Sequence, residues 1–119
     1  MAHRHVSPAQ LAICKQYGVA SEPTSADDIA GVADSVMRGD IPLNGRRHPA
    51  PHGISGWYFW AGEVDIPQDD DGFFEPHHLH HLDAVCSLVV PYLALPAGWR
   101  ILLAPDYADV WFDSSLLKA

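Results

Sequence analysis

The stretch that decides the fold is Gly56-Trp57-Tyr58-Phe59-Trp60-Ala61-Gly62, the densest aromatic run in the chain. Aromatic side chains fit the pleated surface of a sheet, so this run predicts a strand over 57–62. Alternation places Trp57 and Phe59 on one side of the strand and Tyr58 and Trp60 on the other. Because both sides are apolar, the strand is either covered on both faces or presents aromatic residues to a partner.

Two further strands are predicted near the C-terminus, at 99–103 and 109–113. They flank Pro105-Asp106-Tyr107-Ala108, a tetrad typical of a tight turn, so they are expected to form an antiparallel hairpin. We expect the hairpin and the strand over 57–62 to share one antiparallel sheet.

Three helices are predicted around these strands. The first begins at Ser7-Pro8-Ala9-Gln10, a capping box with proline in the first turn. The second runs from Thr24 or Ser25 to Gly39, because apolar residues there recur at helical spacing. The third begins at Pro76 and continues to Leu93 with a kink at Pro91, which removes a backbone donor.

Residues 42–56 are rich in proline and glycine and poor in apolar residues, which predicts a long loop. This segment is also the most basic part of the chain. Its cationic side chains are Arg46, Arg47, His48 and His52.

The predicted order is helix, helix, strand, helix, strand, strand. The predicted fold class is therefore α+β: a small antiparallel sheet of about three strands packed against helices. With 119 residues, the chain has the usual length of one domain, so we expect a single domain over 1–119.

Charge limits the classes of partner. Fifteen acidic and seven basic residues give a net charge of −8, with the basic residues scattered. Binding to nucleic acid or to an anionic membrane needs clustered Lys and Arg, so neither is expected. A basic protein would be attracted to this acidic chain. Two cysteines, no apolar run of about 20 residues and no leader-like N-terminus predict a cytoplasmic protein.

The acidic segment 63–75 concentrates six of the fifteen acidic residues and contains no basic one. Such a run is either a solvated loop or a binding site for a cationic partner. The candidate partner-binding set combines the acidic residues of this segment with nearby aromatic anchors. Its members are Glu63, Asp65, Asp69, Asp70, Asp71, Tyr58, Trp60 and Trp111.

The stretch His77-His78-Leu79-His80-His81 has spacings that can place two imidazoles on one metal ion. Further ligands would have to come from Asp83, His52 or 69–71. The helical zinc-protease motif is absent, because no Glu lies between histidines in the required arrangement. A solvated helix end is the simpler interpretation, so no metal and no cofactor is predicted, and a site using His78 and His81 is the alternative.

Nucleophilic catalysis has little support in the sequence. Cys14 and Cys86 lie on faces expected to be buried, where the reactive thiolate is disfavoured. The serines lack the strand-turn-helix elbow of the hydrolases, and Gly53-Ile54-Ser55-Gly56 precedes a strand, unlike a phosphate-binding loop. We therefore predict that the protein is not an enzyme.

Four segments together resemble a known family of small bacterial proteins. They are Gly56 to Glu63; Phe73-Phe74-Glu75-Pro76 with His78 and His81-Leu82; Tyr92-Leu93 with Leu95 to Arg100; and Asp109 to Asp113 with Ser115-Leu116-Leu117. The family is the immunity-protein-thirty-three-like family of polymorphic toxin systems. The resemblance covers about residues 42–117 and includes His78 and His81, but not His77 or His80.

The resemblance implies a non-catalytic protein that binds and neutralises a cognate toxin, and it transfers no catalytic residue. Two other interpretations stay open. One is a metal-binding module or metal-dependent enzyme using the histidines at 77–81, and the other is a regulatory or scaffold domain with a different partner.

Overall fold

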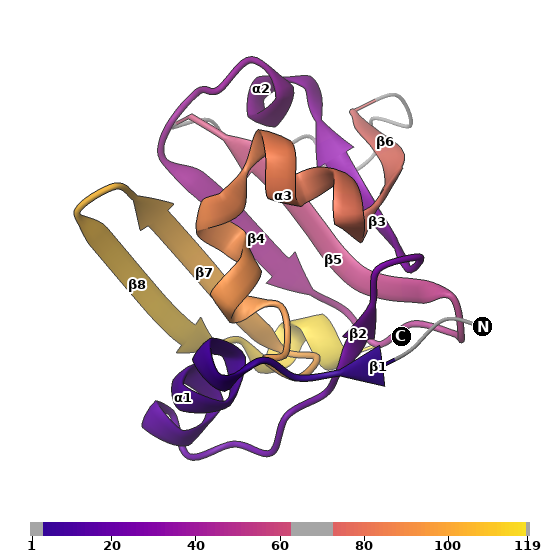
Figure 1. The fold of residues 1–119 in the computed structure, drawn as a ribbon, viewed down its shortest axis with the longest axis vertical. Coiled ribbons are helices and arrows are strands. Elements are labelled where there is room, and N and C mark those ends of the chain that lie inside the picture. The colour runs from indigo at the N-terminus through magenta and orange to yellow at the C-terminus, as the bar shows by residue number, and fades with distance from the viewer. Residues whose placement is uncertain (1–3, 63–72, 119) are drawn as a thin grey trace.

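A computed structural model describes residues 4–62 and 73–118, and its central element is a six-stranded mixed sheet (Figure 1). The strands lie in the order β6-β3-β5-β4-β7-β8. All neighbouring pairs are antiparallel except β3 and β5, which are parallel. Their bounds are β3 Ile29–Ala33, β4 Leu43–Arg47, β5 Ile54–Ala61, β6 Phe74–His78, β7 Trp99–Ala104 and β8 Tyr107–Phe112.

The other elements are short. Two strands, β1 (Arg4–His5) and β2 (Thr24–Ser25), form a separate antiparallel pair. The helices are α1 Pro8–Gln16, α2 Asp34–Met37 and α3 Leu82–Val85, with 3-10 turns η1 Leu79–His81, η2 Ser87–Tyr92 and η3 Ser114–Leu117. No helix among the described residues is long and apolar enough to cross a bilayer.

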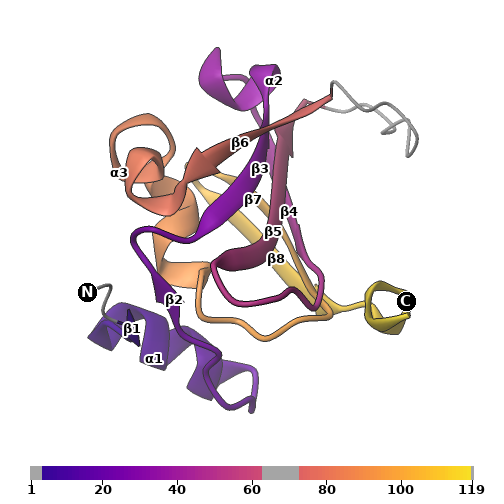
Figure 2. The same cartoon turned by 90° about the vertical axis from the view of Figure 1, so that its right-hand side faces the viewer.

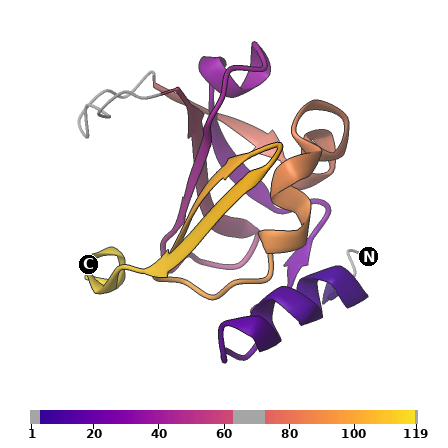
Figure 3. The ribbon, with the colours of Figure 1, turned by 90° about the vertical axis from the view of Figure 1, so that its left-hand side faces the viewer.

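One face of the sheet is covered by helices and holds the core. Figures 2 and 3 show α1, α3 and the turns that follow α3 on this side of the strands. Trp57 and Phe59 of β5 point into the core with no exposed surface, their rings stacked 5.4 Å apart. The indole N–H of Trp57 donates to the carbonyl of Leu93, which links the central strand to the end of η2.

The predicted fold class is wrong: the molecule is mostly β, with six strands in one mixed sheet and few short helices. The three expected strands overlap β5, β7 and β8, although Gly62 and Asp113 lie outside them, and the pairing of the C-terminal hairpin is confirmed. The prediction lacked three strands, β3, β4 and β6. Because β4 lies between β5 and β7, the aromatic strand does not pair with the hairpin directly.

The second predicted helix, up to Gly39, is wrong over most of its length. Residues Ile29–Ala33 form β3, and only the four residues of α2 are helical. Ala30 and Val32 are buried at a spacing of two, against β5 on one side and β6 on the other. Pairing on both sides outweighs a local apolar spacing that fits a helix equally well.

The predicted loop over 42–56 is confirmed only for residues 42 and 48–53 and is otherwise wrong, because Leu43–Arg47 form β4 near the centre of the sheet and β5 begins at Ile54. Gly45, which suggested a loop, is required by packing. A Cβ there would lie 2.9 Å from side-chain atoms of both Phe59 and Ile101. The missing side chain is what allows these two neighbours to approach the strand.

The third predicted helix is replaced by several shorter elements. Pro76 lies in β6, an edge strand, where a residue without an N–H is tolerated. The helical stretch then breaks at Cys86, whose φ of −150° and ψ of 62° are not helical. The apolar residues of this segment still point inward, and Leu82, Val89 and Leu93 are buried.

The first helix begins as predicted. Ser7 Oγ accepts from the N–H of Gln10 at 3.2 Å, and the Gln10 side chain accepts from the N–H of Ser7 at 3.1 Å. The Gln10 side-chain amide also donates to the carbonyl of Val90, so Gln10 holds α1 against η2.

Candidate functional site: the open face of the sheet

The second face of the sheet, here called the open face, carries no helix among the described residues except η3 beyond one end of the strands (Figures 2 and 3). Strand pairing and alternation define which side chains it presents. One row crosses all six strands in register: Pro76, Gly31, Tyr58, Arg46, Arg100 and Trp111.

Aromatic side chains form one half of the open face. Phe74 of β6 makes edge contacts with Tyr58 and Trp60 of β5, at centroid distances of 5.2 and 6.3 Å. Tyr58 lies across Gly31 of β3, where a Cβ would come within 2.6 Å of its ring. A hollow of about 190 Å³ opens beside this cluster and is lined partly by Tyr58, Phe74 and the exposed Ile54.

Two arginines form the other half. Arg46 of β4 and Arg100 of β7 are direct cross-strand neighbours. The Arg46 guanidinium lies 5.4 Å from the ring of Trp60, and the Arg100 guanidinium lies 5.2 Å from the ring of Trp111. The arginines therefore occupy the two inner strands, and the tryptophans occupy the strands on either side.

The two guanidinium groups are incompletely paired. The Nε atoms of Arg46 and Arg100 are buried without a hydrogen-bond partner in the described part of the chain. Arg100 Nη1 lies 3.4 Å from Oδ2 of Asp113 at the end of β8. Burial lowers the pKa of Arg46, and the neighbouring charge of Arg100 lowers it further, as expected for like charges held together.

The Imm33-like domain model matches residues 9–113, from the first turn of α1 to the residue after β8. The chain belongs to the Imm33-like family. The recognition made from sequence motifs over 42–117 is thus confirmed, and the match also includes α1 and β3. The name of the family indicates toxin immunity. No curated protein and no solved structure matches the chain significantly.

The open face of this Imm33-like domain brings together the three aromatic residues of the predicted site, Tyr58, Trp60 and Trp111. Tyr58 and Trp111 are partly exposed, whereas Trp60 is only 4% exposed beneath its neighbours. The acidic members of the predicted set, Glu63, Asp65, Asp69, Asp70 and Asp71, lie outside the described residues.

Arg46 and Arg100 were not among the residues predicted for the site. Arg46 was expected in a loop, and Arg100 was expected in the strand over 99–103 without a functional role. The alternation of small or apolar and polar residues over 43–47 was the available signal, since it puts Asn44 and Arg46 on the face opposite Leu43 and Gly45.

The histidines at 77–81 lie close together, with ring centroids 4.4 Å apart for His80 and His81 and 6.1 Å apart for His78 and His81, but they do not form a metal site with the described residues. His77 and His78 belong to β6, and His80 and His81 belong to η1, with ring centroids of His77 and His81 6.2 Å apart. Among the described residues, no group of three His, Cys, Asp or Glu side chains is arranged to hold a metal ion. His78 Nδ1 instead lies 2.9 Å from the carbonyl oxygen of Asp27.

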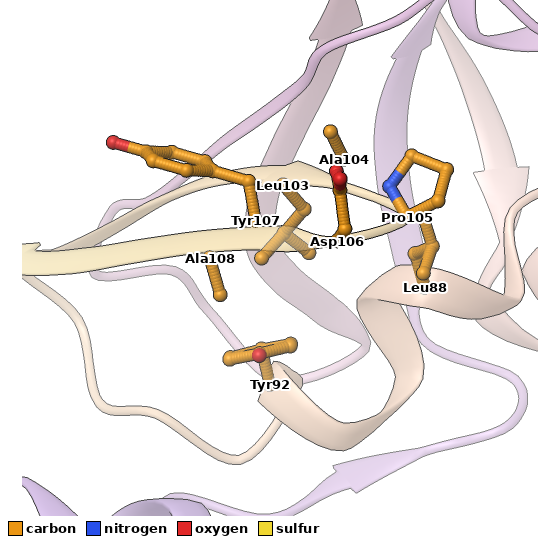
Figure 4. Close-up of a pocket in the computed structure, with 8 residues that line it drawn as sticks. All are labelled: Leu88, Tyr92, Leu103, Ala104, Pro105, Asp106, Tyr107 and Ala108. Carbon is orange, nitrogen blue, oxygen red and sulfur yellow. The ribbon is translucent and has the colours of Figure 1, made fainter.

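The cysteines and a second hollow offer little chemistry. Both cysteines are buried as predicted, and burial raises the pKa of the Cys86 thiol to about 11. A hollow of about 300 Å³ lies between η2 and the β7–β8 turn (Figure 4). Asp106 is its one charged lining residue, so it lacks an acid–base pair.

His48 is expected to make stability depend on pH. Its ring makes an edge contact with Tyr58, at a centroid distance of 5.5 Å. Burial lowers the pKa of His48, and the charge of Arg46 lowers it further, whereas a hydrogen bond with the Leu116 backbone and the charge of Asp113 act in the opposite direction. The folded protein therefore binds a proton here less readily than the unfolded chain, whose His pKa is about 6.5.

We expect the free energy of unfolding to rise with pH through the interval just below about 6.5 and to level off above it. In that interval the unfolded chain binds more protons than the folded protein does, so lower pH favours the unfolded state. Urea unfolding of wild type and His48→Gln at pH 5.5 and 7.5 measures this contribution. His48→Gln should show a smaller difference in the free energy of unfolding between pH 5.5 and 7.5 than wild type does. The control His52→Gln, at an exposed turn, should show the same difference in the free energy of unfolding between the two pH values as wild type. An equal difference in all three proteins would contradict the assignment to His48.

Proposed function

We propose that this protein is a non-catalytic immunity protein that binds a cognate toxin through the open face and thereby neutralises it. Family membership supports the toxin as the class of partner. The observation that carries the proposed site is a sheet face without a helical cover among the described residues, which presents Tyr58, Phe74 and Trp111 beside two arginines.

The chemistry of the open face is that of a protein-binding surface. Tyr, Trp and Arg are the residues that most often dominate binding energy, because they combine large apolar area with directed polar groups. The strands hold these side chains in fixed register, so little conformational entropy is lost when a partner docks. The hollow beside Tyr58 and Phe74 would accept an apolar side chain of the toxin.

The acidic segment 63–75 is proposed as a second, electrostatic contribution. Its six carboxylates would attract a basic region of the toxin and raise the association rate. Contacts with the aromatic residues would act mainly on the dissociation rate, because packed central contacts must break before the complex separates.

The proposal is tested by co-expressing the toxin domain encoded beside this gene with the protein. Wild type should restore growth of cells that produce the toxin, and the purified proteins should form a complex. Absence of binding at micromolar concentration would refute the immunity function.

Trp111→Ala is expected to weaken toxin binding by about 30-fold or more, mainly through faster dissociation, as for a central aromatic anchor. The matched control is Phe112→Ala. Phe112 is the next residue of β8, is 49% exposed and faces the opposite side of the sheet, where it contacts Trp99. Surface plasmon resonance gives both rates, and melting temperatures separate lost contacts from lost stability. Equal weakening by the two variants would place the binding site elsewhere.

A further inference from the structure

We propose that the arginine pair, Arg46 and Arg100, binds the carboxylate of an acidic side chain that the toxin presents to the open face. This inference rests on the proposed function and names the chemistry of the partner at its centre. It assigns to the toxin a local charge opposite to that expected from the net charge of −8 of this chain.

The first argument is electrostatic. Two like charges directly opposite each other on neighbouring strands are destabilising, and Arg46 and Arg100 are such a pair. Among the described residues, Asp113 is the one carboxylate bonded to the arginine pair. Of the two arginines it contacts Arg100 alone. Arg46 makes neither an ion pair nor a side-chain hydrogen bond with any described residue. Counted over the residues that the structure describes, the pair therefore keeps an excess positive charge, which a second carboxylate would neutralise.

The second argument concerns unused donors. Each guanidinium has five N–H donors in a planar fork, and a carboxylate accepts two of them at once. The Nε atoms of both arginines are buried and have no acceptor among the described residues, so the outer Nη atoms are the donors that an incoming carboxylate can reach. The Arg100 side chain is 29% exposed and Arg46 is also partly exposed, so their outer nitrogen atoms are accessible.

The third argument is preorganisation. Trp60 of β5 and Trp111 of β8 lie against the guanidinium groups of Arg46 and Arg100. These contacts restrict the rotamers of both arginines before a ligand arrives. A carboxylate held between the arginines would meet donors already in place, which strengthens a charge-assisted hydrogen bond.

A side-chain carboxylate fits this site better than a nucleic acid does. A nucleic acid backbone needs a line of cations over several phosphates, whereas the open face offers one close pair of arginines. His48, which contacts Tyr58 in the same row and is influenced by the charge of Arg46, adds little positive charge because its lowered pKa disfavours its charged form.

The test replaces both arginines at once, Arg46→Met with Arg100→Met, and measures folding and toxin affinity. Methionine keeps the apolar contact with the indole rings but removes the donors and the mutual repulsion. The double variant should melt no lower than about 2 °C below wild type, yet bind the toxin at least about 30-fold more weakly. The matched control is Arg38→Met, an exposed arginine paired with Asp40, which should leave affinity within about twofold.

A double-mutant cycle identifies the carboxylate. One Asp→Asn or Glu→Gln variant of the toxin should bind wild type as weakly as the unchanged toxin binds the double methionine variant. The toxin variant and the double methionine variant should bind each other no more weakly than that. Unchanged affinity of the double variant would overturn the inference and leave the proposed function standing. If wild type binds no toxin, both fail. If wild type instead shows shifted Trp60 and Trp111 indole signals with inorganic phosphate alone, the site takes a free anion and the inference is overturned.

Discussion

Replacing Arg47 with Met is expected to lower the free energy of unfolding by about 3–5 kcal/mol, the effect of removing one partner from a buried charged network. Arg47 is 2% exposed on the core side of β4. Its Nε donates to the carbonyl of Ser55 at 2.8 Å, and its Nη1 lies within 3.1 Å of the carbonyl oxygens of Glu22, Leu93 and Leu95.

These contacts explain the size of the effect. Methionine would fill part of the volume but leave buried carbonyl oxygens without a donor, each at a cost of about 1–3 kcal/mol unless water replaces the bond. Four segments distant in sequence meet at this one side chain, so its loss loosens β4, the start of β5, the chain after η2 and the segment before β2 together.

Urea unfolding measures the Arg47 effect. The control Arg38→Met should change the free energy of unfolding by less than about 0.5 kcal/mol, because the Arg38–Asp40 pair is exposed. Arg47→Lys should fall between wild type and Arg47→Met, since one ammonium cannot reproduce the fork. An Arg47→Met variant within about 1 kcal/mol of wild type would show that these hydrogen bonds do not hold the core.

The second large effect is expected for Gly56→Ala at the start of β5, with a loss of about 3 kcal/mol or more. Gly56 has a φ of +87°, and an added Cβ would overlap the carbonyl oxygen of His48. The obstacle is backbone, and the N–H of His48 donates to the Gly56 carbonyl at 2.9 Å, so the two chains cannot separate without losing this bond.

Gly53→Ala is the matched control for Gly56→Ala. Gly53 has the same φ of +87°, but no heavy atom lies within 4 Å of its would-be Cβ. It should lose only the conformational term, about 1–2 kcal/mol. The difference between the two alanine variants in thermal or urea unfolding therefore isolates the collision with His48. Equal losses of stability in the two variants would mean that the backbone at His48 moves aside without cost.

Local sequence was sufficient for the elements whose determinants are neighbours in the chain. The capping box at Ser7 and Gln10 uses contacts three residues apart, and the 99–103/109–113 hairpin closes through a four-residue turn. The run from Trp57 to Trp60 consists entirely of aromatic residues, whose strand propensity was enough to predict β5. Family motifs spread through the chain were enough to recognise an Imm33-like protein.

Tertiary structure alone decided the rest, because the deciding contacts join residues far apart in sequence. Ile29–Ala33 became a strand through parallel pairing with β5 and antiparallel pairing with β6, which a spacing equally suited to a helix cannot reveal. Arg46 and Arg47 are adjacent in sequence, yet alternation sends one to the open face beside Arg100 and the other into the core against carbonyls of distant segments. A charged side chain is buried only where acceptors surround it, and pairing of the six strands is what brings those acceptors together.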